Sequence, residues 1–257
     1  MYLIKLGGSV ITEKSSTATF RNKIMDDLAC QLALSKKDFI IVHGAGSFGH
    51  VLAKKYELNT GFSNEDQRYG FSLTQGMVQT LNSHVLSSLQ KHQLAAVSLP
   101  AHAMLTLHNH DLETFDMNLF HEYVDKGFTP VTYGDVALDS HIGFSICSGD
   151  LLMWLLAKEF QPEKVIFVID EDGIYTKNPK RYQDATLLET INRNELDSLQ
   201  TSLDAHADVT RGMAGKLQII KKITSLSIDT VLVNGLVSDR LFHVLTNQPT
   251  IQTIIKG

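Results

Sequence analysis

The stretch that decides the fold runs from residue 39 to residue 50 and reads Phe39-Ile40-Ile41-Val42-His43-Gly44-Ala45-Gly46-Ser47-Phe48-Gly49-His50. A β-branched apolar run of this kind is typical of a buried strand, and here it stops at a cluster of glycines. Glycines let backbone amides approach an anion closely, and the N-terminus of a following helix adds partial positive charge. The stretch therefore predicts a strand, an anion-binding loop and a helix.

A second junction of the same kind opens the chain, where Tyr2-Leu3-Ile4-Lys5-Leu6 leads into Gly7-Gly8-Ser9. A lysine near the end of a parallel strand extends over the carboxyl edge of the sheet, where α/β proteins bind ligands. Its ammonium group can offset negative charge on a group in transfer. Two glycine loops, one with Lys5 and one with His50, indicate a site that holds two phosphate groups at once, which suits a kinase whose acceptor is itself a phosphate.

Strand-like and helix-like segments alternate along the whole chain. The expected strands are Tyr2–Leu6, Phe39–His43, Leu94–Leu99, Thr129–Tyr133, Gly143–Cys147, Lys164–Ile169 and Thr230–Val233. The expected helices are Arg21–Lys37, Gln67–His92, Asp150–Phe160, Arg193–Ser198 and Gly212–Leu226. Such alternation implies βαβ units. We therefore expect an α/β fold, a three-layer αβα sandwich with a mainly parallel central sheet.

Composition narrows the class of protein. The 257 residues suit a single domain. Within it, Gln161-Pro162-Glu163 weakly indicates a hinge between an N-terminal lobe of about 1–160 and a C-terminal lobe of about 161–257. A net charge of −5 gives no reason to expect nucleic-acid binding, and no apolar run is long enough to span a membrane. Two cysteines, Cys30 and Cys147, suggest buried thiols in a reducing cytoplasm.

Three further segments combine glycine with charged residues. Ser148-Gly149-Asp150 opens an expected helix, where Asp150 is either an ordinary N-cap or a buried carboxylate that holds two lysine ammonium groups. The acidic turn Asp170-Glu171-Asp172-Gly173-Ile174-Tyr175, followed by Asn178-Pro179, is either a nucleotide loop or a plain turn. The third segment, Asp208 to Lys216, is suited to the β- and γ-phosphates of ATP but is not a Walker A motif.

Gly44, Gly46 and Gly49 also match the G-x-G-x-x-G pattern of dinucleotide-binding proteins. That alternative requires an acidic residue at the end of the next strand, about 20 positions on. Glu65 and Asp66 stand at that distance, but their surroundings resemble a loop. A dehydrogenase is therefore the weakest of the readings that the sequence leaves open.

Taken together, the motifs resemble those of the amino acid kinase superfamily, and within it those of the isopentenyl phosphate kinases. The resemblance rests on Lys5-x-Gly-Gly-Ser, His43-Gly-Ala-Gly-Ser-Phe-Gly-His50, Tyr133-Gly-Asp, Ser148-Gly-Asp150, Asp172-Gly-x-Tyr and Asp208-Val-Thr-x-Gly-Met-x-Gly-Lys216. The motifs stand in the family's order from Lys5 to about Asn234. The family histidine at the position of His50 contacts an acceptor that already carries a phosphate or phosphonate.

The resemblance implies a role for each residue. Lys5, Lys14 and Lys216 would neutralise the phosphates in transfer, Asp150 would orient lysines, and His50 would bind the acceptor phosphate. The expected acceptor site is completed by Gly44, Ala45, Gly46, Gly49 and Gly149. The expected ATP site comprises Lys5, Gly7, Gly8, Ser9, Asp170, Gly173, Tyr175, Pro179, Gly212, Met213 and Lys216. Magnesium would be held by phosphate oxygens and water, with no protein ligand, and the superfamily favours a cytoplasmic homodimer.

Two other activities remain open on the same fold. A fosfomycin kinase would need no apolar acceptor pocket, whereas a C5 tail needs apolar walls, which Tyr69, Phe71, Met77 and Val78 can supply. A non-catalytic ligand sensor would not need the lysines. A protonated His50 would assist transfer, so activity is expected to fall as pH rises through its pKa.

The chain departs from the family pattern at one position. Arg211 stands where the family commonly has glycine, so that this chain reads Thr210-Arg211-Gly212-Met213. If the position needs a positive φ angle, arginine is unfavourable there. We expect its side chain to face solvent, with an added phosphate contact as the alternative.

Overall fold

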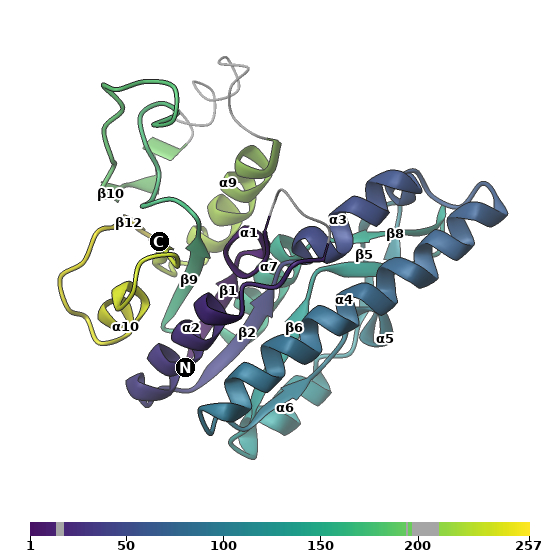
Figure 1. The fold of residues 1–257 in the computed structure, drawn as a ribbon, viewed down its shortest axis with the longest axis horizontal. Helices are drawn as coiled ribbons and strands as arrows, with labels where there is room; N and C mark the ends of the chain where they lie inside the picture. The colour runs from purple at the N-terminus through teal and green to yellow at the C-terminus, as the bar shows by residue number, and fades with distance from the viewer. Residues whose placement is uncertain (14–17, 194, 197–210) are drawn as a thin grey trace.

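The computed structural model describes residues 1–13, 18–193, 195–196 and 211–257, and for residues 211–214 it describes the backbone alone. Figure 1 shows the arrangement of the elements, with helices on both sides of a large twisted sheet. None of the helices in the described part of the chain combines the length and apolar character that a membrane crossing requires.

The large sheet has eight strands. Their order is β10 (Thr190–Ile191), β12 (Gln252–Ile255), β11 (Thr230–Asn234), β9 (Lys164–Ile169), β1 (Tyr2–Leu6), β2 (Phe39–His43), β6 (Thr129–Tyr133) and β3 (Ala96–Ser98). All neighbours are parallel except β11 and β12. The expectation of a mainly parallel central sheet is confirmed.

Helices cover the sheet on both faces and form two apolar cores. On one face lie α2 (Asn22–Ser35), α4 (Glu65–Lys91) and α10 (Arg240–Leu245). On the other lie α6 (Asn118–Asp125), α7 (Gly149–Phe160) and α9 (Arg211–Thr224). Because the central strands are buried on both faces, they are apolar at successive positions, as buried parallel strands are. The three-layer sandwich is therefore also confirmed.

A second sheet of four strands lies at the opposite end of the molecule from β10 and β12 (Figure 1). Its order is β5 (Asp111–Phe115), β4 (Leu105–His108), β7 (Asp135–Asp139) and β8 (Gly143–Cys147). Of these strands the sequence predicted β8 alone. The buried Asp139 carboxylate accepts hydrogen bonds from the backbone amides of Asn109, His110, His141 and Ile142 and thereby ties together the two turns of this sheet.

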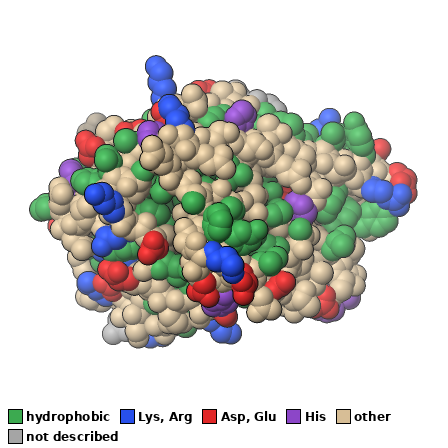
Figure 2. All heavy atoms as spheres, turned by 90° about the horizontal axis from the view of Figure 1, so that it is seen from below, with side chains coloured by type: hydrophobic (Ala, Val, Ile, Leu, Met, Phe, Trp, Pro, Cys, Tyr) green, Lys and Arg blue, Asp and Glu red, His purple; other side chains and the backbone are tan. Residues whose placement is uncertain are grey.

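Four short elements remain, of which the first two follow the glycine loops, the third packs against β8 and the fourth packs against β7. They are α1 (Gly8–Ile11), α3 (Gly46–Lys55), the 3-10 turn Leu58–Thr60 and α5 (Ala101–Met104). Figure 2 shows one face of the molecule, on which basic and acidic side chains are interspersed. That face offers no broad surface of a single charge.

Candidate active site

The alternation of side chains along β1 decides where Lys5 points. Tyr2, Ile4 and Leu6 pack into the core beneath α2 and α4, whereas Leu3 packs into the core beneath α7 and α9. Because successive side chains of a strand face opposite sides, Lys5 lies on the same face as Leu3. The strand is central, with β2 on one side and β9 on the other. The Lys5 ammonium is therefore buried beneath the start of α7.

Two lysines share one carboxylate oxygen there. Asp150 Oδ1 lies 2.7 Å from Lys5 Nζ and 3.0 Å from Lys216 Nζ. The Lys216 ammonium also lies 5.0 Å from the centre of the Phe167 ring. The N-cap of α7 is Ser148, which accepts from the Leu151 amide, so the Asp150 carboxylate is not used as a cap. The structure thus brings Lys5, Asp150 and Lys216 into direct contact.

The environment shifts the ionisation of this triad. Burial, together with the charge of Lys216, lowers the pKa of Lys5 to about 8, although Asp150 opposes both effects. Burial alone would raise the pKa of Asp150, but the two ammonium groups outweigh it and hold that pKa below its ordinary value. The triad therefore carries a net positive charge at neutral pH.

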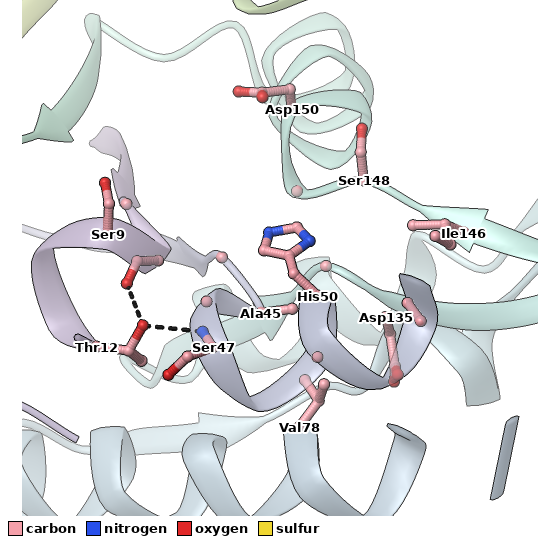
Figure 3. Close-up of a pocket in the computed structure, with 18 of the residues that line it drawn as sticks. Ser9, Thr12, Ala45, Ser47, His50, Val78, Asp135, Ile146, Ser148 and Asp150 are labelled. Atoms are coloured by element: carbon pink, nitrogen blue, oxygen red, sulfur yellow. Dashed lines mark hydrogen bonds between the residues drawn. The ribbon is translucent and has the colours of Figure 1, made fainter. Parts of the chain in front are cut away.

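A cavity of about 490 Å³ opens above the triad, at the carboxyl ends of the central strands (Figure 3). The predicted site residues that line it are Lys5, Gly7, Gly8, Ser9, Gly44, Ala45, Gly46, Gly49, His50, Gly149, Asp150, Asp170 and Lys216. Both glycine loops therefore open into the same cavity. This is the edge at which open parallel sheets bind ligands.

The second glycine loop leads directly into α3, which begins at Gly46. A buried His43 supports it from below, stacked on the Tyr133 ring at 4.9 Å and with Nε2 3.3 Å from Asn82 Oδ1. Burial lowers the pKa of His43 to about 4, so this ring is neutral. The predicted strand and helix are present, with the glycine loop between them.

His50 stands in the middle of the cavity in Figure 3, with Ser9 on one side and Ser148 on the other. Removal of water by the cavity walls lowers its pKa, and the charge of Lys5 lowers it further. These effects favour the neutral imidazole in the unliganded protein, and the expected fall in activity as a protonated His50 is lost stays a prediction. A neutral imidazole still donates one N–H to an anion.

The part of the cavity that α3, α4, β7 and β8 line carries several apolar side chains. They are Val51, Ala53, Val78, Val136 and Ile146, and the polar residues Thr74 and Asp135 lie among them. Of the four wall residues expected from α4, only Val78 lines the cavity.

The other three expected wall residues have different surroundings. Phe71 packs against Phe144, Met77 packs on the core beneath α2 and α4, and Tyr69 is 62% exposed. The helical period predicted that α4 would contribute to the pocket, but it did not identify which turn of the helix reaches the cavity.

The acidic turn after β9 divides into two parts. Asp170 lines the cavity and accepts a hydrogen bond of 2.8 Å from Ser9 Oγ. Gly173, at a φ angle of 154°, packs against Thr253, and neither Tyr175 nor Pro179 lines the cavity. The turn thus extends outward from the cavity.

Asp172 of the same turn is engaged by its neighbours. Its Oδ1 accepts from Asn234, at 2.7 Å, and from Arg240. These contacts fix the turn to the end of β11 and the start of α10.

Part of the predicted phosphate site lies outside the described residues. Lys14 is not among the described residues, and neither are Asp208, Val209 and Thr210 of the third glycine segment. Gly212 and Met213 fall in the first turn of α9, which begins at Arg211. Helical backbone has a negative φ angle, which arginine adopts freely, so Arg211 occupies a conformation open to any L-residue.

Several residues of the cavity were not predicted as site residues. Thr12 lines it and bonds to both glycine loops, and Asp135 lines it at the start of β7. The Asp135 carboxylate lies 2.6 Å from His102 Nδ1. The sequence features that could have identified these two residues are a threonine between Gly8 and Lys14 and an aspartate directly after Gly134.

The acidic residues that a dinucleotide-binding protein would need are elsewhere. Glu65 and Asp66 lie in the first turn of α4 and are exposed, far from the end of any strand of the large sheet. This arrangement removes the support for a dehydrogenase.

Comparison with known proteins agrees with the geometry. A family model described as the amino acid kinase family matches residues 1–234. The chain belongs to the amino acid kinase family. A relative from Methanothermobacter thermautotrophicus named isopentenyl phosphate kinase is 38% identical, and the alignment covers 100% of this chain and 99% of the relative.

Solved structures give the same result. An X-ray structure of isopentenyl phosphate kinase is 34% identical and superposes with a TM-score of 0.88 over 100% of both chains. A product complex of the Thermoplasma acidophilum isopentenyl phosphate kinase is 30% identical, with a TM-score of 0.84 and complete coverage of both chains. The amino acid kinase fold of this chain is therefore preserved from end to end.

The first prediction concerns Lys5. We expect its amine to titrate near pH 8, charged below that pH and neutral above it, and to titrate at a lower pH in Asp150→Asn, because the carboxylate that favours the charged form is gone. NMR titration of lysine labelled at Cε measures this directly, with Lys5→Arg to assign the signal.

Glu159→Gln, on the exposed end of the same helix, is the matched control and should leave the Lys5 titration unchanged. A Lys5 pKa at its ordinary value of 10.5 in the unaltered protein would contradict the electrostatic account.

Proposed function

We propose that this chain is an ATP-dependent kinase that converts isopentenyl phosphate to isopentenyl diphosphate. The observation that carries the proposal is one cavity in which two glycine loops meet over a lysine pair and whose walls include several apolar side chains. Such a cavity suits a triphosphate and a second phosphate bearing a hydrocarbon tail. The names of the similar proteins support the same substrate.

The donor and acceptor would occupy different parts of the cavity. We assign the ATP phosphates to the loop after β1, with Lys5, Lys14 and Lys216, and the nucleoside to the side of the acidic turn and the start of α9. We assign the acceptor phosphate to the loop after β2, with His50 and the Gly149 amide, and its tail to the apolar walls. This assignment places the acceptor in the N-terminal lobe and ATP mainly in the C-terminal lobe.

The chemistry requires little acid–base assistance. An oxygen of the acceptor phosphate attacks the γ-phosphorus, the bond from that phosphorus to the β–γ bridging oxygen breaks, and ADP leaves. Because a phosphate monoester is already ionised, no strong general base is needed, and the difficulty is to hold two polyanions together. Lys5 and Lys216 offset that charge, and Asp150 keeps both ammonium groups in place against their mutual repulsion.

Magnesium would enter with ATP. Among the described residues no group of three or more histidine, cysteine, aspartate or glutamate side chains is placed to hold a metal ion, and the Asp150 carboxylate is already engaged by two lysines. The residues present therefore fit an ion that is bound by phosphate oxygens and water. Its chemistry would be neutralisation of phosphate charge, shared with the lysines.

The proposal is tested by ADP release with magnesium and ATP, comparing isopentenyl phosphate, dimethylallyl phosphate and fosfomycin. We expect turnover with the isoprenyl phosphates, because the apolar walls can take up a C5 tail. Turnover with fosfomycin alone would replace the proposal with an antibiotic kinase. ATP binding without turnover of any of the three would indicate a ligand sensor.

His50 provides a separate prediction. His50→Ala removes an N–H donor from the acceptor phosphate and should lower turnover of isopentenyl phosphate by roughly 100-fold, whereas His50→Gln should retain part of the activity. Steady-state kinetics of both variants measures the difference. The exposed His121→Ala, on α6 outside the cavity, is the control. Near-normal turnover in His50→Ala would remove His50 from the mechanism.

We also propose that the protein is a cytoplasmic homodimer, as the family resemblance implies. Two large apolar side chains near α6, Leu119 and Phe128, are 43% and 39% exposed, and burial against a second copy would be favourable. Light scattering coupled to size exclusion should give a mass twice that of the 28.6 kDa chain. A mass equal to one chain at micromolar concentration would exclude a stable dimer.

A further inference from the structure

The two glycine loops are in direct backbone contact. A Cβ atom added to Gly8 would lie 2.6 Å from the Gly46 amide nitrogen, and one added to Gly44 would lie 2.7 Å from the Gly8 amide nitrogen. Both separations are shorter than side-chain atoms tolerate, so no residue larger than glycine fits at this contact. The loop after β1 and the loop after β2 are therefore packed against each other without an intervening side chain.

One hydroxyl group joins the two loops at this contact. Thr12, which is 1% exposed, donates from Oγ1 to the Gly8 carbonyl at 2.7 Å and accepts from the Ser47 amide at 3.0 Å. Figure 3 shows these two hydrogen bonds as dashed lines, beside the cavity that contains His50. The Gly8 carbonyl belongs to the first loop, and the Ser47 amide belongs to the first turn of α3.

The position of Thr12 also explains why residue 46 is a glycine. Gly46 has a φ angle of 51°, and a Cβ atom there would lie 2.3 Å from Thr12 Oγ1. The threonine thus occupies the space that a side chain at position 46 would need. Because the Ser47 amide donates to Thr12, it is directed toward the other loop, and the second loop is held at a fixed distance from the first.

We propose that Thr12 is a positioning residue for phosphoryl transfer, in that its hydroxyl sets the separation between the donor loop and the acceptor loop. The proposal rests on the proposed function, in which one loop holds ATP and the other holds the acceptor phosphate. In-line transfer tolerates little error in the distance between the two reacting groups, and a displacement of about 1 Å can cost roughly 100-fold in rate.

A residue that sets the separation between the two loops should affect the rate of phosphoryl transfer more than the binding of ATP or acceptor. Each phosphate is bound by the amides of its own loop, and loss of the hydroxyl leaves those amides in place. Loosening the junction between the loops therefore changes how often the two bound phosphates are aligned. The expected signature is a lower kcat with KM values for ATP and acceptor near those of the unaltered protein.

The experiment compares Thr12→Val with Thr12→Ser in steady-state kinetics on magnesium-ATP and isopentenyl phosphate. Valine keeps the shape of threonine but neither donates nor accepts, so we expect kcat to fall at least about tenfold with both KM values within about threefold. Serine keeps the hydroxyl and should restore kcat to within about threefold. The assays are run well below the melting temperature of each variant.

Thr253→Val is the matched control. Thr253 is also buried, donates to the Leu188 carbonyl at 2.7 Å and accepts from the Ile174 amide at 2.8 Å, but it joins segments outside the cavity. We expect it to lose a similar amount of thermal stability and to keep its kcat at saturating ATP, with any change confined to the KM for ATP, because the turn that it holds lies on the nucleoside side. The comparison separates loss of two buried hydrogen bonds from loss of the junction between the loops.

Three results would overturn the proposal. If Thr12→Val keeps its kcat while its melting temperature falls as in Thr253→Val, the hydroxyl is structural only. If a KM rises more than about tenfold at unchanged kcat, Thr12 serves ligand binding instead. If the unaltered protein itself shows no turnover, the proposed function fails and the role of Thr12 fails with it, a result distinct from the first two.

Discussion

Two ammonium groups that share one carboxylate oxygen are the interaction on which the arrangement of this protein depends. Lys5 comes from the central strand, Asp150 from the first turn of α7 and Lys216 from α9, so three distant segments meet at one point. Unpaired, the lysines would repel each other, and burial would favour loss of their charge. The strand and the two helices bring them together on one face of the sheet, and the carboxylate lets the ammonium groups remain charged beside the cavity.

The central layer of the fold was predictable because its signal is local. Strands β1, β2, β6 and β9 of the large sheet have the predicted bounds, since each is a short apolar run that ends at glycine or at an acidic turn. Strands β4, β5 and β7 were missed because their residues are partly polar and their pairing depends on distant segments. The Asp139 carboxylate, which joins the two turns of that sheet, accepts from residues up to 30 positions away.

The candidate site was predictable in its composition but not in its electrostatics. Glycine spacing identified the two loops that line the cavity, because glycine directly after a strand lets backbone approach closely. The ionisation of His50 was not predictable, because its pKa depends on the cavity walls and on Lys5, which stands 45 positions earlier in the chain. The choice of Val78 rather than Phe71 as a cavity wall likewise depends on how α4 crosses α3.

The glycines of the two loops meet two physical demands at once. An anion-binding loop needs exposed amides, and glycine provides them; a junction between two such loops also needs backbones that can touch, and only glycine permits the contacts at Gly8, Gly44 and Gly46. A motif that predicts phosphate binding therefore also encodes the distance between the two loops. Because the loops are joined by backbone contact and by the Thr12 hydroxyl, their separation is already set in the unliganded protein.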